Sequence, residues 1–236
     1  MSSIDCHPIP PFDAVLFDMD GLLIDSESIA LQAMQAAALE QGIDMPVELR
    51  FQMIGMPADG CRKLVADRYG SAVAIEPLFA AATRHLEAFV QAGQLHLKPG
   101  VEAMLAALDR LRVPRAVATS SGQRRAHHHL QLTGIFDRMQ AVVTRDDVAR
   151  GKPHPDLFLE AARRLGVPPA RCLAFEDSYN GVRAAAAAGV PVVMVPDLLQ
   201  ATPEMHAVAL RVFGSLHEVL PCISDRQPLP LAAGAG

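Results

Sequence analysis

The second half of the chain alternates short apolar segments with helical segments, and this alternation restricts the fold more than any other feature. Strand patterns occur at 115–118, 141–144, 172–175, 192–195 and 210–213. Between them, helical patterns occur at 101–112, 123–133, 156–166 and 180–188. Strands that alternate with helices form parallel sheets with helices on both faces. We therefore predict an α/β fold with a Rossmann-like parallel sheet as its core.

One further strand pattern lies far upstream, at 15–17, and only helical patterns fill the block that follows it. Because the first strand needs the later ones to complete a sheet, this block is most simply an insertion. We predict a core domain of residues 1–26 and 94–236 and an all-helical cap domain of residues 27–93. The insertion begins near the C-terminal end of the first strand, so we expect a cap over the active-site opening that moves on two linkers.

Two aspartates follow the first strand directly, in the sequence Phe17-Asp18-Met19-Asp20-Gly21. Open α/β sheets bind ligands beyond the carboxyl ends of their strands. Two nearby carboxylates repel each other, so they require a cation, a shared proton or separate roles. The same sequence is also typical of a structural turn that leads into a helix. On this stretch alone, the two interpretations are equally good.

Polar groups also follow the strand pattern at 115–118, in the sequence Thr119-Ser120-Ser121-Gly122. Hydroxyl and backbone N–H groups at a strand-to-helix turn suit phosphate oxygens. Helix capping by these side chains is the alternative. Further along, Lys152 lies between a glycine and two prolines, which restrict the backbone and help fix the direction of its ammonium group. Such a lysine suits a phosphoryl group or a pair of carboxylates, and the alternative is an exposed loop lysine.

Two adjacent acids, Glu176 and Asp177, follow the strand pattern at 172–175. Acids that are buried without a partner are costly. Together with Asp18 and Asp20, they offer the hard oxygen ligands that Mg²⁺ prefers. A solvated turn, with Asp177 or Ser178 as a helix cap, is the alternative. Four carboxylates, a lysine and a hydroxyl near strand ends are poorly explained by coincidence, so we expect a Mg²⁺ site there.

Composition and charge argue against several classes of protein. The net charge is −5 and the pI is about 6.0, which does not favour nucleic acid or an anionic membrane as a partner. The most apolar stretch, 184–195, is too short to span a bilayer, and the N-terminal sequence lacks a signal-peptide pattern. The four cysteines show no metal-ligand spacing, so we expect reduced thiols. These features predict a cytoplasmic protein, with a monomer as the default.

Four motifs, taken in order, resemble the signature motifs of the haloacid dehalogenase superfamily. They are Phe17-Asp18-Met19-Asp20-Gly21, Thr119-Ser120-Ser121, Gly151-Lys152-Pro153-His154-Pro155-Asp156 and Glu176-Asp177-Ser178-Tyr179-Asn180-Gly181. Each motif is modest alone, but four in order are specific, and the resemblance covers residues 12–220. The helical insertion is similar to the cap of the branch that contains sugar-phosphate phosphatases and β-phosphoglucomutase. The resemblance implies a Mg²⁺-dependent phosphatase that acts on a small phosphorylated metabolite.

The resemblance also implies a role for each catalytic side chain. Asp18 would be the nucleophile and would form an aspartyl-phosphate. Asp20 would protonate the leaving oxygen and later activate the hydrolytic water. Thr119 would hold a phosphoryl oxygen, and Lys152 would neutralise charge around Asp18 and the phosphate.

The resemblance further implies how the metal ion and the phosphate are held. Mg²⁺ would be bound by Asp18, by the backbone carbonyl of Asp20 and by Asp177, with Glu176 beside it. The groups expected to bind the phosphate are Gly21, Ser120 and Ser121.

The sequence bears on three alternatives to a phosphatase: a dehalogenase, a mutase and a non-catalytic binding protein. A true dehalogenase needs no acid for an alkoxide leaving group, so Asp20 argues against it. β-Phosphoglucomutase resembles this chain in fold, but it carries a histidine where this chain has Ala30 and an arginine in the cap loop, where residues 55–58 supply none. It also carries a lysine and an asparagine where this chain has Gly122 and Gln123. We favour hydrolysis, and keep a mutase and a non-catalytic phosphate-binding protein as alternatives.

The substrate is predicted only by class. The cap loop near Met56 is uncharged, which favours a small and largely neutral leaving group, such as a sugar or a nucleoside. Residues 118–122 and 193–197 resemble phosphatases that act on pseudouridine or sugar phosphates, although a shared fold does not name a substrate.

Overall fold

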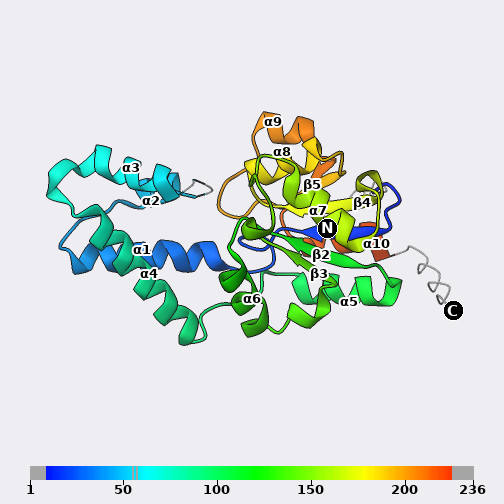
Figure 1. Ribbon diagram of the computed structural model, residues 1–236, viewed down its shortest axis with the longest axis horizontal. Coiled ribbons are helices and arrows are strands. Elements are labelled where there is room, and N and C mark those ends of the chain that lie inside the picture. The colour runs from blue at the N-terminus through cyan, green and yellow to red at the C-terminus, as the bar shows by residue number, and fades with distance from the viewer. Residues whose placement is uncertain (1–8, 55, 57, 225–236) are drawn as a thin grey trace, which may run out of the picture. The chain divides into compact units, whose positions relative to one another are not determined.

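The computed structural model describes residues 9–54, 56 and 58–224, and the chain divides into two compact units (Figure 1). The first unit comprises Met1–Ile24 and Leu97–Gly236, and the second is Asp25–His96. The predicted boundaries at residues 26 and 94 lie within a few residues of these. The tail from residue 227 and the first eight residues lie outside the described part of the chain.

The first unit is built on one six-stranded parallel sheet, as predicted. Its strands are β1 (Ala14–Phe17), β2 (Arg115–Ala118), β3 (Ala141–Val143), β4 (Cys172–Glu176), β5 (Val192–Met194) and β6 (Arg211–Val212). The spatial order is β3-β2-β1-β4-β5-β6, with Phe17 paired with Val117 on one side and with Phe175 on the other. The strand order reverses beside β1, and a ligand site is expected beyond the carboxyl ends of the strands at such a point.

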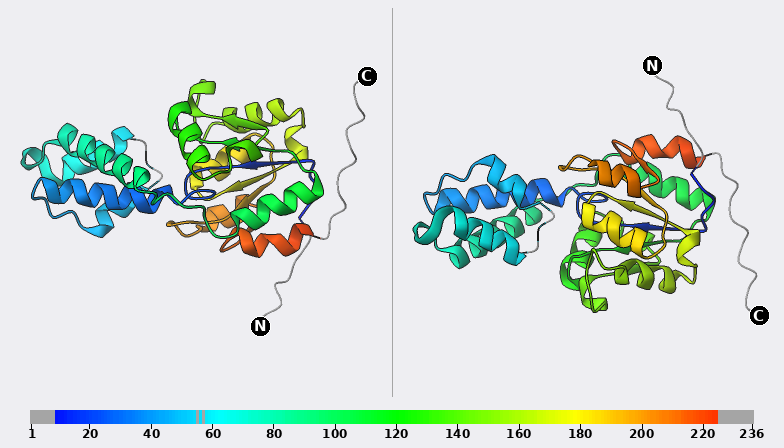
Figure 2. Two further views of the ribbon diagram at one scale, coloured as in Figure 1. Left: turned by 90° about the horizontal axis from the view of Figure 1, so that it is seen from below. Right: turned by 90° about the horizontal axis from the view of Figure 1, so that it is seen from above.

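Helices cover both faces of this sheet (Figure 2). They are α5 (Val101–Leu111), α6 (Gln123–Leu132), α7 (Asp156–Leu165), α8 (Tyr179–Ala187), α9 (Pro203–Val208) and α10 (Leu216–Ser224). The views show α7 and α8 on one face and α5 and α10 on the other. Leu16 of β1 packs with Leu157 and Phe158 of α7 in a buried cluster. Full burial of each such side chain contributes roughly 1.5–3 kcal/mol, which holds the strand ends in place.

The second unit contains four α-helices within its described residues. They are α1 (Ser26–Glu40), α2 (Val47–Gln52), α3 (Ala58–Tyr69) and α4 (Ile75–Gln91). Ala37 of α1, Val65 of α3 and Leu78 of α4 share one buried core. This unit therefore has its own hydrophobic interior. Short 3₁₀ turns complete the two units, at Gly70–Ala72, Phe136–Arg138, Arg145–Asp147 and Pro169–Arg171.

The two chain connections between the units run side by side. Within the first unit, Ile24 forms an antiparallel bridge with Leu97, and the Lys98 N–H donates to the carbonyl of Leu23 at 2.9 Å. Within the second unit, the Asp25 N–H donates to the carbonyl of His96 at 2.9 Å. The chain thus leaves and re-enters the first unit at adjacent positions, as an insertion requires.

The cysteines depart from the expectation of four reduced thiols. Cys61 and Cys172 are free and buried, but Cys222 of α10 is disulfide-bonded. Their spacing in the sequence is irregular, so local pattern could not reveal a bond that depends on distant residues meeting. The expectation was wrong for Cys222.

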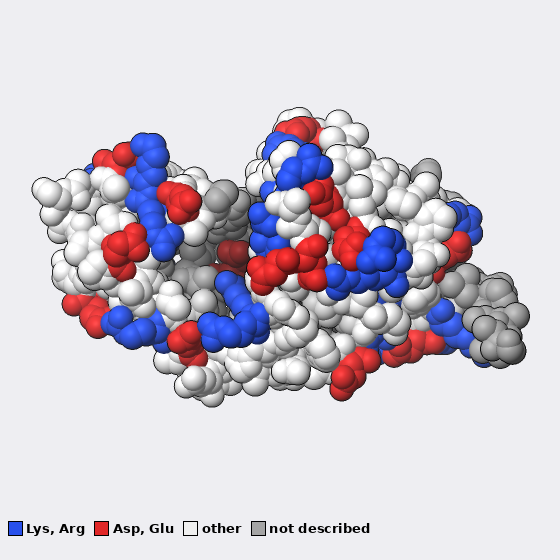
Figure 3. Space-filling view, in the orientation of Figure 1, with Lys and Arg blue, Asp and Glu red and all other residues white. Residues whose placement is uncertain are grey.

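The described surface carries both signs of charge. On the face shown in Figure 3, acidic and basic side chains lie among one another rather than in one broad area of a single sign. Within the described part of the chain, the helices are too short or too polar for any to cross a membrane.

Candidate active site

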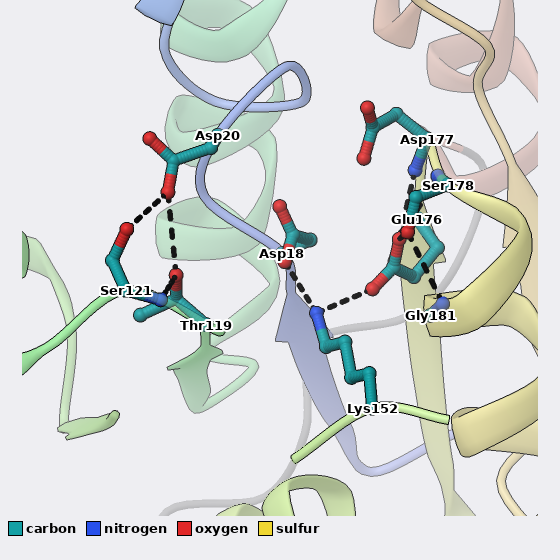
Figure 4. Close-up of polar contacts among 9 residues, drawn as sticks. All are labelled: Asp18, Asp20, Thr119, Ser121, Lys152, Glu176, Asp177, Ser178 and Gly181. Atoms are coloured by element: carbon teal, nitrogen blue, oxygen red, sulfur yellow. Dashed lines mark hydrogen bonds and ion pairs between the residues drawn. The ribbon is translucent and has the colours of Figure 1, made fainter. Parts of the chain in front are cut away.

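A tight turn after β1 places the first two aspartates. The N–H groups of Leu23 and Ile24 both donate to the carbonyl of Met19 at 3.0 Å, and the Gly21 N–H donates to the carbonyl of Ile24 at 2.9 Å. Gly21 adopts a positive φ of 86°, which glycine tolerates without steric cost. The turn sends Asp18 and Asp20 into two separate polar clusters (Figure 4). They are therefore suited to separate roles.

The first cluster joins Asp18 to Lys152 and Glu176. The Lys152 ammonium donates to Oδ1 of Asp18 and to Oε1 of Glu176 (Figure 4). The Lys152 side chain is only 4% exposed, which rules out an exposed loop lysine. The Asp18 N–H donates to the carbonyl of Phe175 at 3.0 Å, which fixes the carboxyl end of β1 against β4. One buried cation thus links the ends of two neighbouring strands and the loop before α7.

Burial and charge set the ionisation of this cluster. Burial raises the pKa of Asp18 to about 8, and the carboxylates of Glu176 and Asp20 add to the rise while Lys152 opposes it. Burial alone would lower the pKa of Lys152, but the adjacent Asp18 and Glu176 carboxylates raise it above its ordinary value. The lysine therefore stays cationic, and any added cation beside Asp18 would favour its ionised form.

The second cluster surrounds Asp20. Its Oδ2 accepts hydrogen bonds from Ser121 Oγ at 2.7 Å and from Thr119 Oγ1 at 3.4 Å (Figure 4). Its Oδ1 accepts from Nη2 of Arg125, on α6, at 3.1 Å. The Ser121 N–H in turn donates to Thr119 Oγ1 at 3.0 Å. Each of these groups can donate a hydrogen bond to the carboxylate, so Asp20 is held firmly at the edge of β2.

The helix-capping alternative fails for the residues after β2. The residue before α6 is Gly122, which makes no side-chain cap, and the Gln123 N–H instead donates to Asp146 Oδ2 at 2.8 Å. Ser120 is exposed. The N–H of Gly21 is already used within its turn, so binding of phosphate by Gly21 and Ser120 stays a prediction.

Glu176 is fully buried, and both of its oxygens have partners. Oε1 accepts from Lys152, and Oε2 accepts from the N–H groups of Asp177 and Ser178 at 3.1 Å and from the Ser178 hydroxyl at 3.0 Å. Ser178 also caps α8 by accepting from the Gly181 N–H at 3.1 Å, which confirms that part of the alternative. This bonding suits Glu176 to positioning Lys152, and its role as a metal ligand stays a prediction.

Because Gly181 has no side chain, the Glu176 carboxylate can occupy the space beside it. A Cβ at position 181 would lie 1.8 Å from Oε1 of Glu176, which is far closer than real atoms approach. We expect Gly181→Ala to displace this carboxylate from Lys152, to destabilise the fold by about 1–3 kcal/mol through overpacking, and to lower kcat roughly 10- to 100-fold. Chemical denaturation and steady-state kinetics measure the two effects.

Gly60→Ala is the matched control, because its Cβ would meet only the flexible side chain of Met56. A helical glycine replaced by alanine gains up to about 1 kcal/mol in helix propensity. Equal behaviour of the two variants would contradict the packing role of Gly181.

The residues that could hold a metal ion lie near Asp18. A Cβ on Gly21 would lie 2.4 Å from Oδ2 of Asp177, so the Asp177 carboxylate packs directly on the backbone of the turn. It points toward the side of the site on which Asp18 lies (Figure 4). Among the described residues, His, Cys, Asp and Glu side chains form no group of three arranged for a metal. The hard oxygen donors are the carboxylates of Asp18 and Asp177 and the backbone carbonyl of Asp20. This set suits Mg²⁺ if water and phosphate oxygens complete its coordination.

Three polar residues at this edge of the sheet were not among the predicted site residues. Arg125 contacts Asp20 from α6, and Lys98 pairs with Asp197 beyond β5 at 2.6 Å. A signal for Asp197 was present, because it lies three residues after the buried strand β5. Arg125 has no such signal, since it lies within an ordinary polar helix.

Comparisons with known proteins show which family the chain belongs to. Residues 12–189 match the family model of haloacid dehalogenase-like hydrolases. The chain is 35% identical over 212 residues to "Probable pseudouridine-5'-phosphatase" of Drosophila melanogaster, which covers 87% of this chain and 90% of that protein. It is 31% identical over 186 residues to the phosphorylated carbohydrates phosphatase of Thermotoga maritima, which covers 75% of this chain and 82% of that protein.

A solved structure is also similar to most of this chain. It is a haloacid dehalogenase family hydrolase from Deinococcus radiodurans with bound phosphate and sodium, with a TM-score of 0.79 and 30% identity. The match covers 92% of this chain and 97% of that one.

Proposed function

The chain belongs to the haloacid dehalogenase-like hydrolases and is a phosphatase, and we propose that it hydrolyses small phosphomonoesters by way of an aspartyl-phosphate on Asp18. The contact of Lys152 with both Asp18 and Glu176 carries this proposal. An anionic nucleophile approaches an anionic phosphate only where cations neutralise both. Lys152 supplies one such charge from a buried position.

In the first step, one carboxylate oxygen of Asp18 attacks phosphorus. A bond forms between that oxygen and phosphorus, while the bond between phosphorus and the leaving oxygen breaks. Asp20, in its protonated form, donates that proton to the leaving oxygen, so the alcohol departs neutral. Thr119 and Ser121 lie beside Asp20 and are suited to holding phosphoryl oxygens and steering that acid.

In the second step, water attacks the phosphorus of the aspartyl-phosphate. Asp20, now ionised, accepts a proton from the water, and the bond between Asp18 and phosphorus breaks. Inorganic phosphate leaves, and both aspartates return to their starting states. The separate positions of Asp18 and Asp20 at the end of β1 fit this division between nucleophile and proton carrier.

We assign the metal site to Asp18, Asp177 and the backbone carbonyl of Asp20. Bound Mg²⁺ supplies positive charge that polarises the phosphoryl group and offsets charge on the transferring oxygens. The packing of Asp177 against Gly21 supports this assignment, because it brings a second carboxylate to the turn that carries Asp18.

The substrate that we propose is a sugar or nucleoside monophosphate. The names of the Drosophila and Thermotoga relatives, which specify pseudouridine phosphate and phosphorylated carbohydrates, support that class. We also propose that the helical unit Asp25–His96 acts as a cap that selects the leaving group. Its two adjacent connections to the first unit support a hinged motion of this kind.

Phosphate release from a panel of phosphomonoesters tests the proposal. We expect release that requires Mg²⁺, stops when EDTA is added, and returns when Mg²⁺ is restored. Sugar and nucleoside monophosphates should be preferred over phosphoglycolate, whose extra carboxylate does not suit a neutral leaving-group site. Preference for phosphoglycolate would contradict the substrate class, and full activity in EDTA would contradict the metal site.

The mutase alternative is tested in parallel with β-glucose 1-phosphate and glucose 1,6-bisphosphate. We expect net phosphate release with little isomerisation. Isomerisation without release would make the chain a mutase despite Ala30, Gly122 and Gln123.

A further inference from the structure

The loop after β5 carries a buried acid that the steps above do not use. The Asp197 side chain is only 7% exposed, and its Oδ1 accepts a hydrogen bond from Lys98 Nζ at 2.6 Å. Its Oδ2 is buried and has no hydrogen-bond partner among the described residues. A buried carboxylate oxygen without a partner is costly, so its presence requires a reason.

The position of that oxygen supplies the reason. A Cβ on Gly21 would lie 2.4 Å from Oδ2 of Asp177 and 3.4 Å from Oδ2 of Asp197. Both carboxylate oxygens therefore border the same small space beside the turn that follows Asp18. Two carboxylates this close repel each other unless a cation lies near them. Lys98 holds the other oxygen of Asp197, which leaves Oδ2 directed at this space.

The charges at this edge of the sheet also favour a bound cation. The carboxylates named above are Asp18, Asp20, Glu176, Asp177 and Asp197. Cationic side chains that contact members of this set include Lys98, Arg125 and Lys152. Acids outnumber the bases named with them, and a bound cation would reduce the negative charge that this excess leaves.

We propose that Asp197 is a positioning residue of the metal site, and that its Oδ2 accepts a hydrogen bond from a water held by Mg²⁺. This inference rests on the proposed Mg²⁺-dependent function. Mg²⁺ gives up its water reluctantly and usually keeps several when it binds a protein. Acceptors for those waters orient the ion and strengthen its binding. Lys98 occupies only Oδ1 of Asp197, so Oδ2 stays available for this hydrogen bond.

Mg²⁺ titration of the full chain by isothermal titration calorimetry tests the proposal. We expect Asp197→Asn to weaken Mg²⁺ binding roughly tenfold, because the neutral amide removes both the charge and one acceptor oxygen. Lys98→Met is the matched control, since it breaks the same ion pair but keeps the carboxylate. It should bind Mg²⁺ at least as tightly as the wild type.

A purely structural ion pair would give a different result. Both variants would then lose thermal stability in EDTA, while their Mg²⁺ dissociation constants would match that of the wild type, and this would overturn the proposal. If Asp197→Asn does not fold, Asp197→Ser repeats the test with a smaller neutral side chain.

The wild-type titration distinguishes failure of the Asp197 proposal from failure of the proposed Mg²⁺-dependent function. If the wild type binds Mg²⁺ and Asp197→Asn binds it equally well, only the role of Asp197 fails. If the wild type binds no Mg²⁺, the proposed metal-dependent function fails, and this inference fails with it. A Mg²⁺-induced rise in Tm that is smaller in Asp197→Asn than in Lys98→Met would be independent support.

Discussion

Asp18→Asn is expected to abolish phosphate release, with a fall in kcat of at least about a thousandfold on every substrate of the panel. The amide has nearly the same shape as the carboxylate, but it cannot attack phosphorus to form an acyl phosphate. The substituted side chain should stay between Lys152 and the end of β1, because backbone hydrogen bonds hold the strand in position there. Release of inorganic phosphate under saturating substrate measures the effect.

Asp13→Asn is the control for this variant. Asp13 also flanks β1, but it pairs with Arg171 at 2.7 Å on the exposed side of the unit. Its activity should stay close to that of the wild type. An Asp18→Asn variant that kept a tenth or more of the wild-type kcat would show that another group attacks phosphorus.

Lys152→Met is expected to impair both activity and folding. Removal of one partner from a buried ion pair costs about 3–5 kcal/mol, because the remaining charges lose their compensation. Here Asp18 and Glu176 would both be left in a buried site with no ammonium group between them. We also expect kcat to fall by roughly 10²–10³, since the site loses a fixed positive charge near the reacting phosphate. Chemical denaturation and kinetics measure the two effects.

Lys63→Met provides the comparison. Lys63 forms an exposed pair with Asp67 at 2.8 Å in the helical unit, and exposed pairs of this kind contribute at most about 1 kcal/mol. Its free energy of unfolding and kcat should be close to wild type. If Lys152→Met behaved in the same way, the buried ammonium would have neither a structural nor a catalytic role.

The sheet and the main motif residues could be predicted because their signals are local. Each central strand is short and mostly apolar. Asp18 and Thr119 directly follow β1 and β2, and Glu176 is the last residue of β4. Parallel pairing then brings these ends together without further information. Lys152 could also be singled out, because its flanking prolines set it apart from other lysines.

Other features depend on contacts between distant parts of the chain. Arg125 reaches Asp20 across 105 residues of sequence, and nothing in the surrounding polar helix distinguishes it from its neighbours. Gly181 is needed because of the Glu176 carboxylate, which only the packing of α8 against β4 reveals. The six-residue helix α9 was not predicted either, since so short a segment gives little periodicity.

The stereochemical course at phosphorus distinguishes an aspartyl-phosphate pathway from direct attack by water. A preferred phosphomonoester would be prepared with a chiral phosphorus, labelled with ¹⁶O, ¹⁷O and ¹⁸O, and its phosphoryl group would be transferred to an acceptor alcohol by the wild-type protein. Each in-line displacement inverts phosphorus, so attack by Asp18 followed by attack on the aspartyl-phosphate predicts overall retention of configuration. Overall inversion would mean a single direct displacement, and would contradict the aspartyl-phosphate on Asp18.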